Sequence, residues 1–149
     1  MKTDCILVAT NFSEPSFKAV RYGIELAKQF DARLHVLHVI REMVFYSPTF
    51  GGYMPSREQY AAAATAGLEN AVDPDLAGDL EVTTEYRFGN PHSEILKCAG
   101  ELGSPLIVVG THGRGALAHA VIGSVAENVV RHASCPVLTV HDNQHEFIS

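Results

Sequence analysis

Short, nearly continuous apolar runs alternate with longer segments of helical periodicity along most of this 149-residue chain. In the run CILVAT, consecutive positions are apolar, as in a strand that is covered on both faces. The segment LEVTTEYRF partly alternates instead, which predicts a strand nearer to a sheet edge. The expected strands are Cys5–Thr10, Arg33–Ile40, Leu80–Phe88, Leu106–Val109 and Pro136–Val140.

Apolar residues at helical spacing occupy most of the intervals between these strands. Ser13 provides an N-cap, Glu14 and Pro15 suit a first helical turn, and the pattern continues to about residue 30. The remaining expected helices are Ser56–Val72, a helix that opens at Asn90-Pro91, and a helix whose buried face runs from Ile122 to Ala133. Arg41–Pro55 is irregular, and its aromatic residues and glycines leave two roles open, a lid over a ligand or a surface loop.

The alternation of strands and helices predicts an α/β fold, an open, doubly wound, five-stranded parallel sheet with helices on both faces. We expect one domain over residues 1–149, with a polar tail at about 142–149. Ligands of such sheets bind beyond the carboxyl ends of the strands, where the strand order reverses. The residues that follow the first, second and fourth strands are therefore the first place to look for a site.

Composition and charge exclude several classes of function. The net charge of −6 argues against general binding of nucleic acid, which depends on clustered Lys and Arg. The apolar runs are far shorter than a membrane-spanning helix requires, so we expect no membrane association. Three cysteines without CxxC spacing suit a reducing compartment, which predicts a cytoplasmic protein without disulfides.

One stretch, VGTHGRGALAHAVIGSV from Val109 to Val125, links the fourth strand to the last helix and is rich in glycine. The glycines either turn the chain or let its backbone approach a phosphate near a helix N-terminus. Ser124 and Glu127 have the spacing of a capping box, which gives the Ser124 hydroxyl a purely structural role. Neither a P-loop nor a dinucleotide-binding GxGxxG pattern is present. Local chemistry alone leaves both hypotheses open.

Gly110, Gly113, Gly123 and Ser124 match the pattern G-x2-G-x9-G-[ST] without a gap, and this pattern resembles the nucleotide-binding signature of the universal stress protein family. The similarity extends to ILVATNFSEPSFKAV, to RLHVLHVI and to the C-terminal third, whereas Met43–Val72 has no clear match. The resemblance implies the family fold and a bound adenine nucleotide: ATP, or ADP or AMP, with or without Mg²⁺.

The resemblance also implies a set of nucleotide-binding residues. Asn11 departs from the family pattern, which usually has Asp there, and Ala9 replaces a frequent Pro. Ala126 follows Val125 where some ATP-binding members have Thr. The residues that match the nucleotide site of the family are Ala9, Thr10, Asn11, Val39, Gly110, Thr111, His112, Gly113, Arg114, Gly123, Ser124 and Val125.

No catalytic or metal-binding motif is present, since GxSxG and HExxH are both missing. His35 and His38 are three apart in a strand and therefore lie on opposite faces. We expect a nucleotide-responsive regulatory module of the stress response with no catalytic residues and at most slow ATP hydrolysis. Two alternatives stay open: an interaction or structural protein that binds no nucleotide, and an enzyme that uses His112 as an acid or base.

The last expected strand, Pro136–Val140, should lie at an edge of the sheet and expose unpaired backbone groups. A second copy of the chain covers such an edge readily across a two-fold axis. Many members of the family resemble dimers of this kind, which implies a homodimer through Pro136–Val140.

Overall fold

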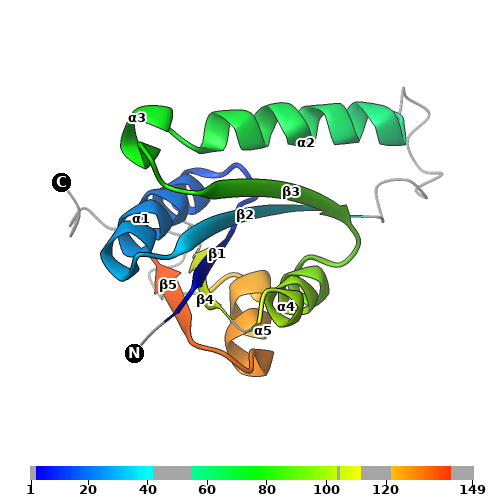
Figure 1. The fold of residues 1–149 in the computed structure, drawn as a ribbon. Coiled ribbons are helices and arrows are strands. Elements are labelled where there is room, and N and C mark those ends of the chain that lie inside the picture. The colour runs from blue at the N-terminus through cyan, green and yellow to red at the C-terminus, as the bar shows by residue number, and fades with distance from the viewer. Residues whose placement is uncertain (1–2, 42–54, 104, 112–121, 142–149) are drawn as a thin grey trace.

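The computed structural model describes residues 3–41, 55–103, 105–111 and 122–141. Its five strands form one parallel sheet in the order β3-β2-β1-β4-β5 (Figure 1). This order confirms the doubly wound fold that the sequence pattern predicts. The strands are β1 Cys5–Ala9, β2 Arg33–Ile40, β3 Val82–Phe88, β4 Leu106–Gly110 and β5 Val137–Val140.

Helices cover both faces of this sheet. On one face lie α1 (Glu14–Phe30), α2 (Arg57–Ala71) and the short α3 (Pro74–Ala77), and on the other lie α4 (Pro91–Glu101) and α5 (Ser124–His132). Helix α3 was not expected from the sequence, because four residues are too few to show a period. It follows the N-cap Asp73, whose carboxylate accepts hydrogen bonds from two backbone N–H groups.

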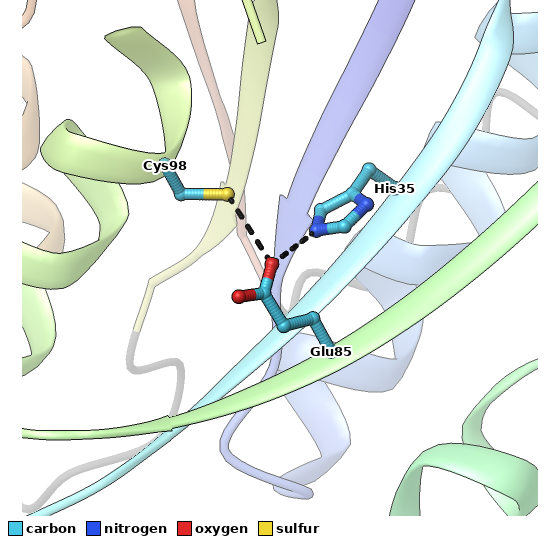
Figure 2. A group of neighbouring side chains, drawn as sticks. All are labelled: His35, Glu85 and Cys98. Carbon is cyan, nitrogen blue, oxygen red and sulfur yellow. Dashed lines mark hydrogen bonds and ion pairs between the residues drawn. The ribbon is translucent and has the colours of Figure 1, made fainter. Parts of the chain in front are cut away.

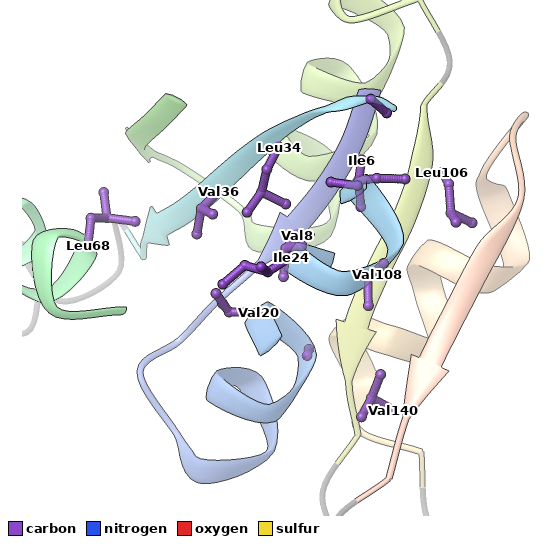
Figure 3. Close-up of a cluster of buried hydrophobic side chains, with 13 residues drawn as sticks. Ile6, Val8, Val20, Ile24, Leu34, Val36, Leu68, Leu106, Val108 and Val140 are labelled. Carbon is purple, nitrogen blue, oxygen red and sulfur yellow. The ribbon is translucent and has the colours of Figure 1, made fainter. Parts of the chain in front are cut away.

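The central strands are buried on both faces, which explains their continuous apolar runs. In β1, Ile6 and Val8 pack toward α1, whereas Leu7 packs toward α4 and α5, and none of the three is exposed (Figure 3). Burial of each such side chain stabilises the fold by about 1.5–3 kcal/mol. The two apolar layers hold the carboxyl ends of β1 and β4 side by side.

The strand order reverses between β1 and β4. From β1 the chain crosses to β2 on one side, whereas β4 pairs with the other side of β1. Gly110, the last residue of β4, lies so close to α1 that an added Cβ would stand 2.6 Å from the carbonyl oxygen of Pro15. A glycine at this position therefore lets the N-terminus of α1 lie directly against the end of β4.

Strands β3 and β5 form the two edges of the sheet, as expected for Leu80–Phe88 and Pro136–Val140. Within the described ranges, no helix combines the length and the hydropathy that crossing a membrane requires.

Candidate functional site

A pocket lies where the strand order reverses, beyond the carboxyl ends of β1, β2 and β4. It holds about 820 Å³ of space, including its open mouth. Its walls come from the ends of these strands and from the first turns of α1, α4 and α5. The lining residues are Ala9, Thr10, Asn11, Ser13, Pro15, Ser16, Leu37, Val39, Arg41, Pro91, Ile95, Val109, Gly110, Thr111, Gly123, Ser124, Val125 and Ala126.

The structure brings together most of the residues that the family resemblance selects. Three of them, His112, Gly113 and Arg114, lie outside the described residues. The nine that line the pocket are Ala9, Thr10, Asn11, Val39, Gly110, Thr111, Gly123, Ser124 and Val125.

Arg41 and the α4 residues Pro91 and Ile95 also line the pocket, although the sequence motifs do not include them. A signal for the α4 residues was present. In a doubly wound sheet, each helix that follows a strand begins near the carboxyl edge, where ligands bind. A positional signal was also present for Arg41, which directly follows the second expected strand, at the edge where ligands of such sheets bind.

Three helices direct their N-terminal ends at the pocket. The lining includes Ser13 before α1, Pro91 at the start of α4, and Gly123 before α5. Unpaired N–H groups at a helix N-terminus carry a partial positive charge and attract anions. The lining described by the structure contains one charged side chain, Arg41, and no carboxylate. The pocket is therefore suited to an anionic ligand.

Ser124 has a different role from the one its capping pattern predicts. Gly123 is the N-cap of α5, Ser124 is the first helical residue, and no side chain caps this helix. The predicted capping box with Glu127 is therefore wrong, because a side chain at the first helical position points away from the free N–H groups. Within the described part of the chain the Ser124 hydroxyl has no hydrogen bond, so it is available to a ligand.

The side chain of Asn11 is oriented by the loop that joins β1 to α1. Its Oδ1 accepts a hydrogen bond from the backbone N–H of Ser13 at 3.1 Å and another from the Ser13 hydroxyl. These bonds assign Oδ1 and leave the Nδ2 amide as the group that Asn11 offers to the pocket. Asn11 therefore presents a hydrogen-bond donor, whereas an Asp in the same position would present a second acceptor.

Two threonines of the pocket use their hydroxyls for structure. The buried Thr10 hydroxyl lies 3.0 Å from the Ser16 hydroxyl and accepts a hydrogen bond from the backbone N–H of Phe12. The buried Thr111 hydroxyl lies 2.6 Å from His141 Nδ1 and donates to the carbonyl oxygen of Val140 at 3.4 Å. These hydroxyls fix the ends of β1 and β4 and shape the pocket.

His38 supports the β1–α1 loop from behind. Its Nδ1–H donates to the carbonyl oxygen of Thr10 at 2.8 Å, and its ring stacks on Phe12 with the centroids 4.2 Å apart. Phe12 has a left-handed φ of 63° and packs under Gly67 of α2. Burial lowers the pKa of His38 below its usual value, so the ring stays neutral at physiological pH.

Comparisons with known proteins agree with this architecture. The model of the universal stress protein family matches residues 3–141. Universal stress protein YxiE of Bacillus subtilis is 36% identical over 143 residues, which cover 91% of this chain and 97% of the relative.

Solved structures show the same fold. The structure of the hypothetical protein MJ0577 superposes with a TM-score of 0.76 at 28% identity, covering 97% of this chain and 100% of that one. A universal stress protein in complex with cAMP superposes with a TM-score of 0.71 at 25% identity, covering 96% of this chain and 100% of that one.

Proposed function

This chain belongs to the universal stress protein family, and on that premise we propose that its pocket binds an adenine nucleotide. A structural relative has been solved in complex with cAMP, which supports this class of ligand. The observation that carries the proposal is the Ser124 hydroxyl, which lines the pocket beside the N-terminus of α5 and has no partner among the described residues.

The lining suggests how a nucleotide lies in the pocket. Phosphates lie at the N-terminus of α5, where Ser124 and the free N–H groups donate hydrogen bonds. The base lies against the apolar side chains of Leu37, Val39 and Ile95. Arg41 adds a full positive charge at the β2 end of the pocket, and it has no ion pair with any described residue.

We propose that binding does not depend on a Mg²⁺ ion held by the protein. Mg²⁺ prefers one or two carboxylates together with phosphate oxygens and water. The described lining offers no carboxylate, and Asn11 presents an amide donor where an Asp would present an acceptor. These residues do not fit a protein-held Mg²⁺. We expect the relative affinities of ATP, ADP and AMP to depend on the hydrogen bonds that the N-terminus of α5 donates directly to their phosphates.

The proposed role is regulatory, in the stress response and in the cytoplasm. A nucleotide in this pocket contacts the β1–α1 loop and the start of α5 at once, so it holds these two elements in one relative position. Partner proteins would recognise that state. Nothing in the described lining provides a nucleophile activated by a base, so we expect at most slow hydrolysis.

We also propose that the chain forms a homodimer through Pro136–Val140. The carbonyl oxygens of Pro136 and Val140 accept hydrogen bonds from Ile107 and Thr111. Because the backbone groups of a parallel strand alternate in direction, Val137 and Thr139 direct their N–H and C=O groups away from β4. The free edge of β5 can therefore pair with a second copy.

Isothermal titration with ATP, ADP, AMP and cAMP tests the nucleotide proposal. The full chain should bind at least one of them with similar affinity in the presence of Mg²⁺ and of EDTA. Ser124→Ala should weaken binding about 5- to 30-fold, since a hydrogen bond to a charged group contributes about 1–2 kcal/mol. Ser134→Ala, at an exposed serine outside the pocket, is the matched control and should bind like the parent chain.

A second candidate function is an interaction protein that binds no nucleotide. The close contact with Pro15 accounts for a glycine at position 110 even if no ligand binds. Hydrogen bonds within the protein likewise give the Thr10 and Thr111 hydroxyls structural roles. Absence of binding by the folded chain at millimolar concentrations of all four nucleotides would favour this candidate and reject the first.

A further inference from the structure

A second group of chemically active side chains lies between the edge of the sheet and α4, outside the pocket. His35 comes from β2, Glu85 from β3 and Cys98 from α4, and the three side chains point toward one another (Figure 2). The His35 Nε2 atom lies 3.0 Å from Glu85 Oε2, and the Cys98 sulfur lies 4.0 Å from the same oxygen. His35 Nε2, one Glu85 oxygen and Cys98 Sγ all lie within 4.8 Å of one another.

The sequence could not indicate this group. The expectation that His35 and His38 lie on opposite faces is confirmed, since His35 faces Cys98 of α4 whereas His38 stacks on Phe12. That separation excludes a site made by the two histidines together. It does not exclude a site that His35 forms with Glu85 and Cys98, which are about fifty and sixty positions away in the sequence.

His35 is supported on its other nitrogen in the way that metal-binding histidines usually are. Its Nδ1 lies 2.7 Å from the Thr83 hydroxyl, which in turn donates to the carbonyl oxygen of Leu34 at 3.4 Å. A hydroxyl that donates to a carbonyl accepts from Nδ1–H, so the Nε2 lone pair becomes available to a metal once the proton that Nε2 donates to Glu85 is lost. A hydrogen bond of this kind orients the ring and directs the other nitrogen toward a metal.

Glu85 is supported in a similar way. Arg87 Nε donates to Glu85 Oε1 at 2.6 Å, whereas the contact of Arg87 with Oε2 is longer, at 3.3 Å. The oxygen that faces His35 and Cys98 is therefore the less firmly held of the two. Burial alone would raise the pKa of Glu85, but hydrogen bonds and charge from Arg87 and His35 outweigh it and lower that pKa, so the side chain is an anion.

The charges around Arg87 are unbalanced. Glu85, Glu94 and Glu101 all form ion pairs with this single guanidinium. Three carboxylates and one cation leave two negative charges, apart from any charge on His35. A metal-bound Cys98 thiolate would add a third negative charge, so a divalent cation beside Glu85 would reduce the excess from three to one.

We propose that His35 Nε2, Glu85 Oε2 and Cys98 Sγ bind a divalent transition-metal ion, with Zn²⁺ as the best match. Imidazole nitrogen, carboxylate oxygen and thiolate sulfur together suit Zn²⁺, whereas Mg²⁺ and Ca²⁺ require oxygen ligands. Zn–N and Zn–S bonds of about 2.0 and 2.3 Å place tetrahedral ligand atoms about 3.5 Å apart. The most widely separated ligand atoms therefore close by up to about 1.3 Å, and a water molecule can take the fourth position beside the partly exposed Glu85.

The alternative is a hydrogen-bonded network that needs no metal. In that state His35 Nε2–H donates to Glu85, and Cys98 keeps its proton, because burial raises the pKa of this thiol to about 11. Zn²⁺ binding breaks the Nε2–H and S–H bonds and forms Zn–N and Zn–S bonds. Nδ1 keeps the proton that it donates to the Thr83 hydroxyl, so the Nε2 proton and the thiol proton both pass to the buffer.

The proposed metal site lies behind the wall of the nucleotide pocket but shares no residue with it. His35 is two residues before Leu37 on the same face of β2, and Cys98 is one helical turn after Ile95 on α4. A bound metal therefore holds α4 against β2. The proposal does not depend on nucleotide binding.

Titration of the full chain with Co²⁺, followed by absorption spectroscopy, tests the proposal. A thiolate-to-cobalt charge-transfer band should grow to one equivalent and disappear when Zn²⁺ is added. Cys98→Ser and His35→Gln should each abolish or strongly reduce the band. Cys135→Ser, at a cysteine outside the group, should retain it.

Two results would overturn the proposal: no charge-transfer band in the parent chain, or a band that persists unchanged in Cys98→Ser. The histidines of this chain that lie outside the group bind metal without a thiolate band, so adventitious binding gives a different spectrum. Circular dichroism shows whether each variant is folded. As a second measurement, Zn²⁺ should raise the melting temperature of the parent chain and leave that of Glu85→Gln unchanged.

Discussion

Replacement of Gly110 by alanine tests the packing that places α1 beside the end of β4. An alanine Cβ would stand 2.6 Å from the carbonyl oxygen of Pro15, 2.7 Å from its carbonyl carbon and 2.9 Å from the nitrogen of Ser16. Ordinary contact begins at 3.4 Å, so the backbones must separate by about 0.8 Å (3.4 − 2.6 Å). All three atoms belong to the backbone, so no side-chain rotation relieves the contact.

Overpacking of this kind costs about 1–3 kcal/mol in the free energy of unfolding. For a domain of this size each kcal/mol lowers the melting temperature by about 2–4 °C. Gly110→Ala should therefore melt about 2–12 °C below the parent chain. It should also bind nucleotide more weakly, because Gly110, Pro15 and Ser16 all line the pocket.

Gly100→Ala is the matched control for this prediction. Gly100 lies in α4, and an added Cβ there meets nothing within 4 Å. Alanine in a helix is about 0.5–1 kcal/mol more favourable than glycine, so this variant should be as stable as the parent or slightly more stable. Urea unfolding of the three proteins provides the free energies. Equal stability of Gly110→Ala and Gly100→Ala would refute the packing argument.

Three further predictions use other contacts. Gly67→Ala should lower the free energy of unfolding by about 1–3 kcal/mol in urea, although alanine favours helix, because its Cβ would overlap the Phe12 ring; unchanged stability would contradict that contact. Glu85 has a lowered pKa in the folded state, so its contribution to stability is present above the unfolded pKa and is lost as the pH falls through the folded pKa. Glu85→Gln should therefore flatten the fall in stability below about pH 4.5, measured by urea unfolding at a series of pH values, and an unchanged acid profile would count against the ion pair with Arg87. Thr139→Pro removes an N–H that points away from β4, so light scattering should show a dimer for the parent chain and a monomer for the variant.

Much of the fold could be predicted from the sequence because its signals are local. The bounds of β2 match the prediction to the residue and α1 ends where the pattern indicated, at about residue 30, since both are long and strongly patterned. The predicted capping box at Ser124 was wrong because the same residues suit two helix starts one residue apart. The first residue of α5 depends on the path of the chain after β4. The spacing of Ser124 and Glu127 contains no information about that path.

By itself the sequence determined the layers of the fold, because hydrophobic periodicity is encoded by neighbouring residues. It also indicated the edge of the sheet where ligands of such folds bind, whereas the residues expected there came from the family resemblance. Tertiary structure alone decided that Asn11 presents its amide donor and that His35 meets Cys98. The physical reason is that these contacts depend on strand register and helix packing, which join residues far apart in the chain and leave no periodic pattern.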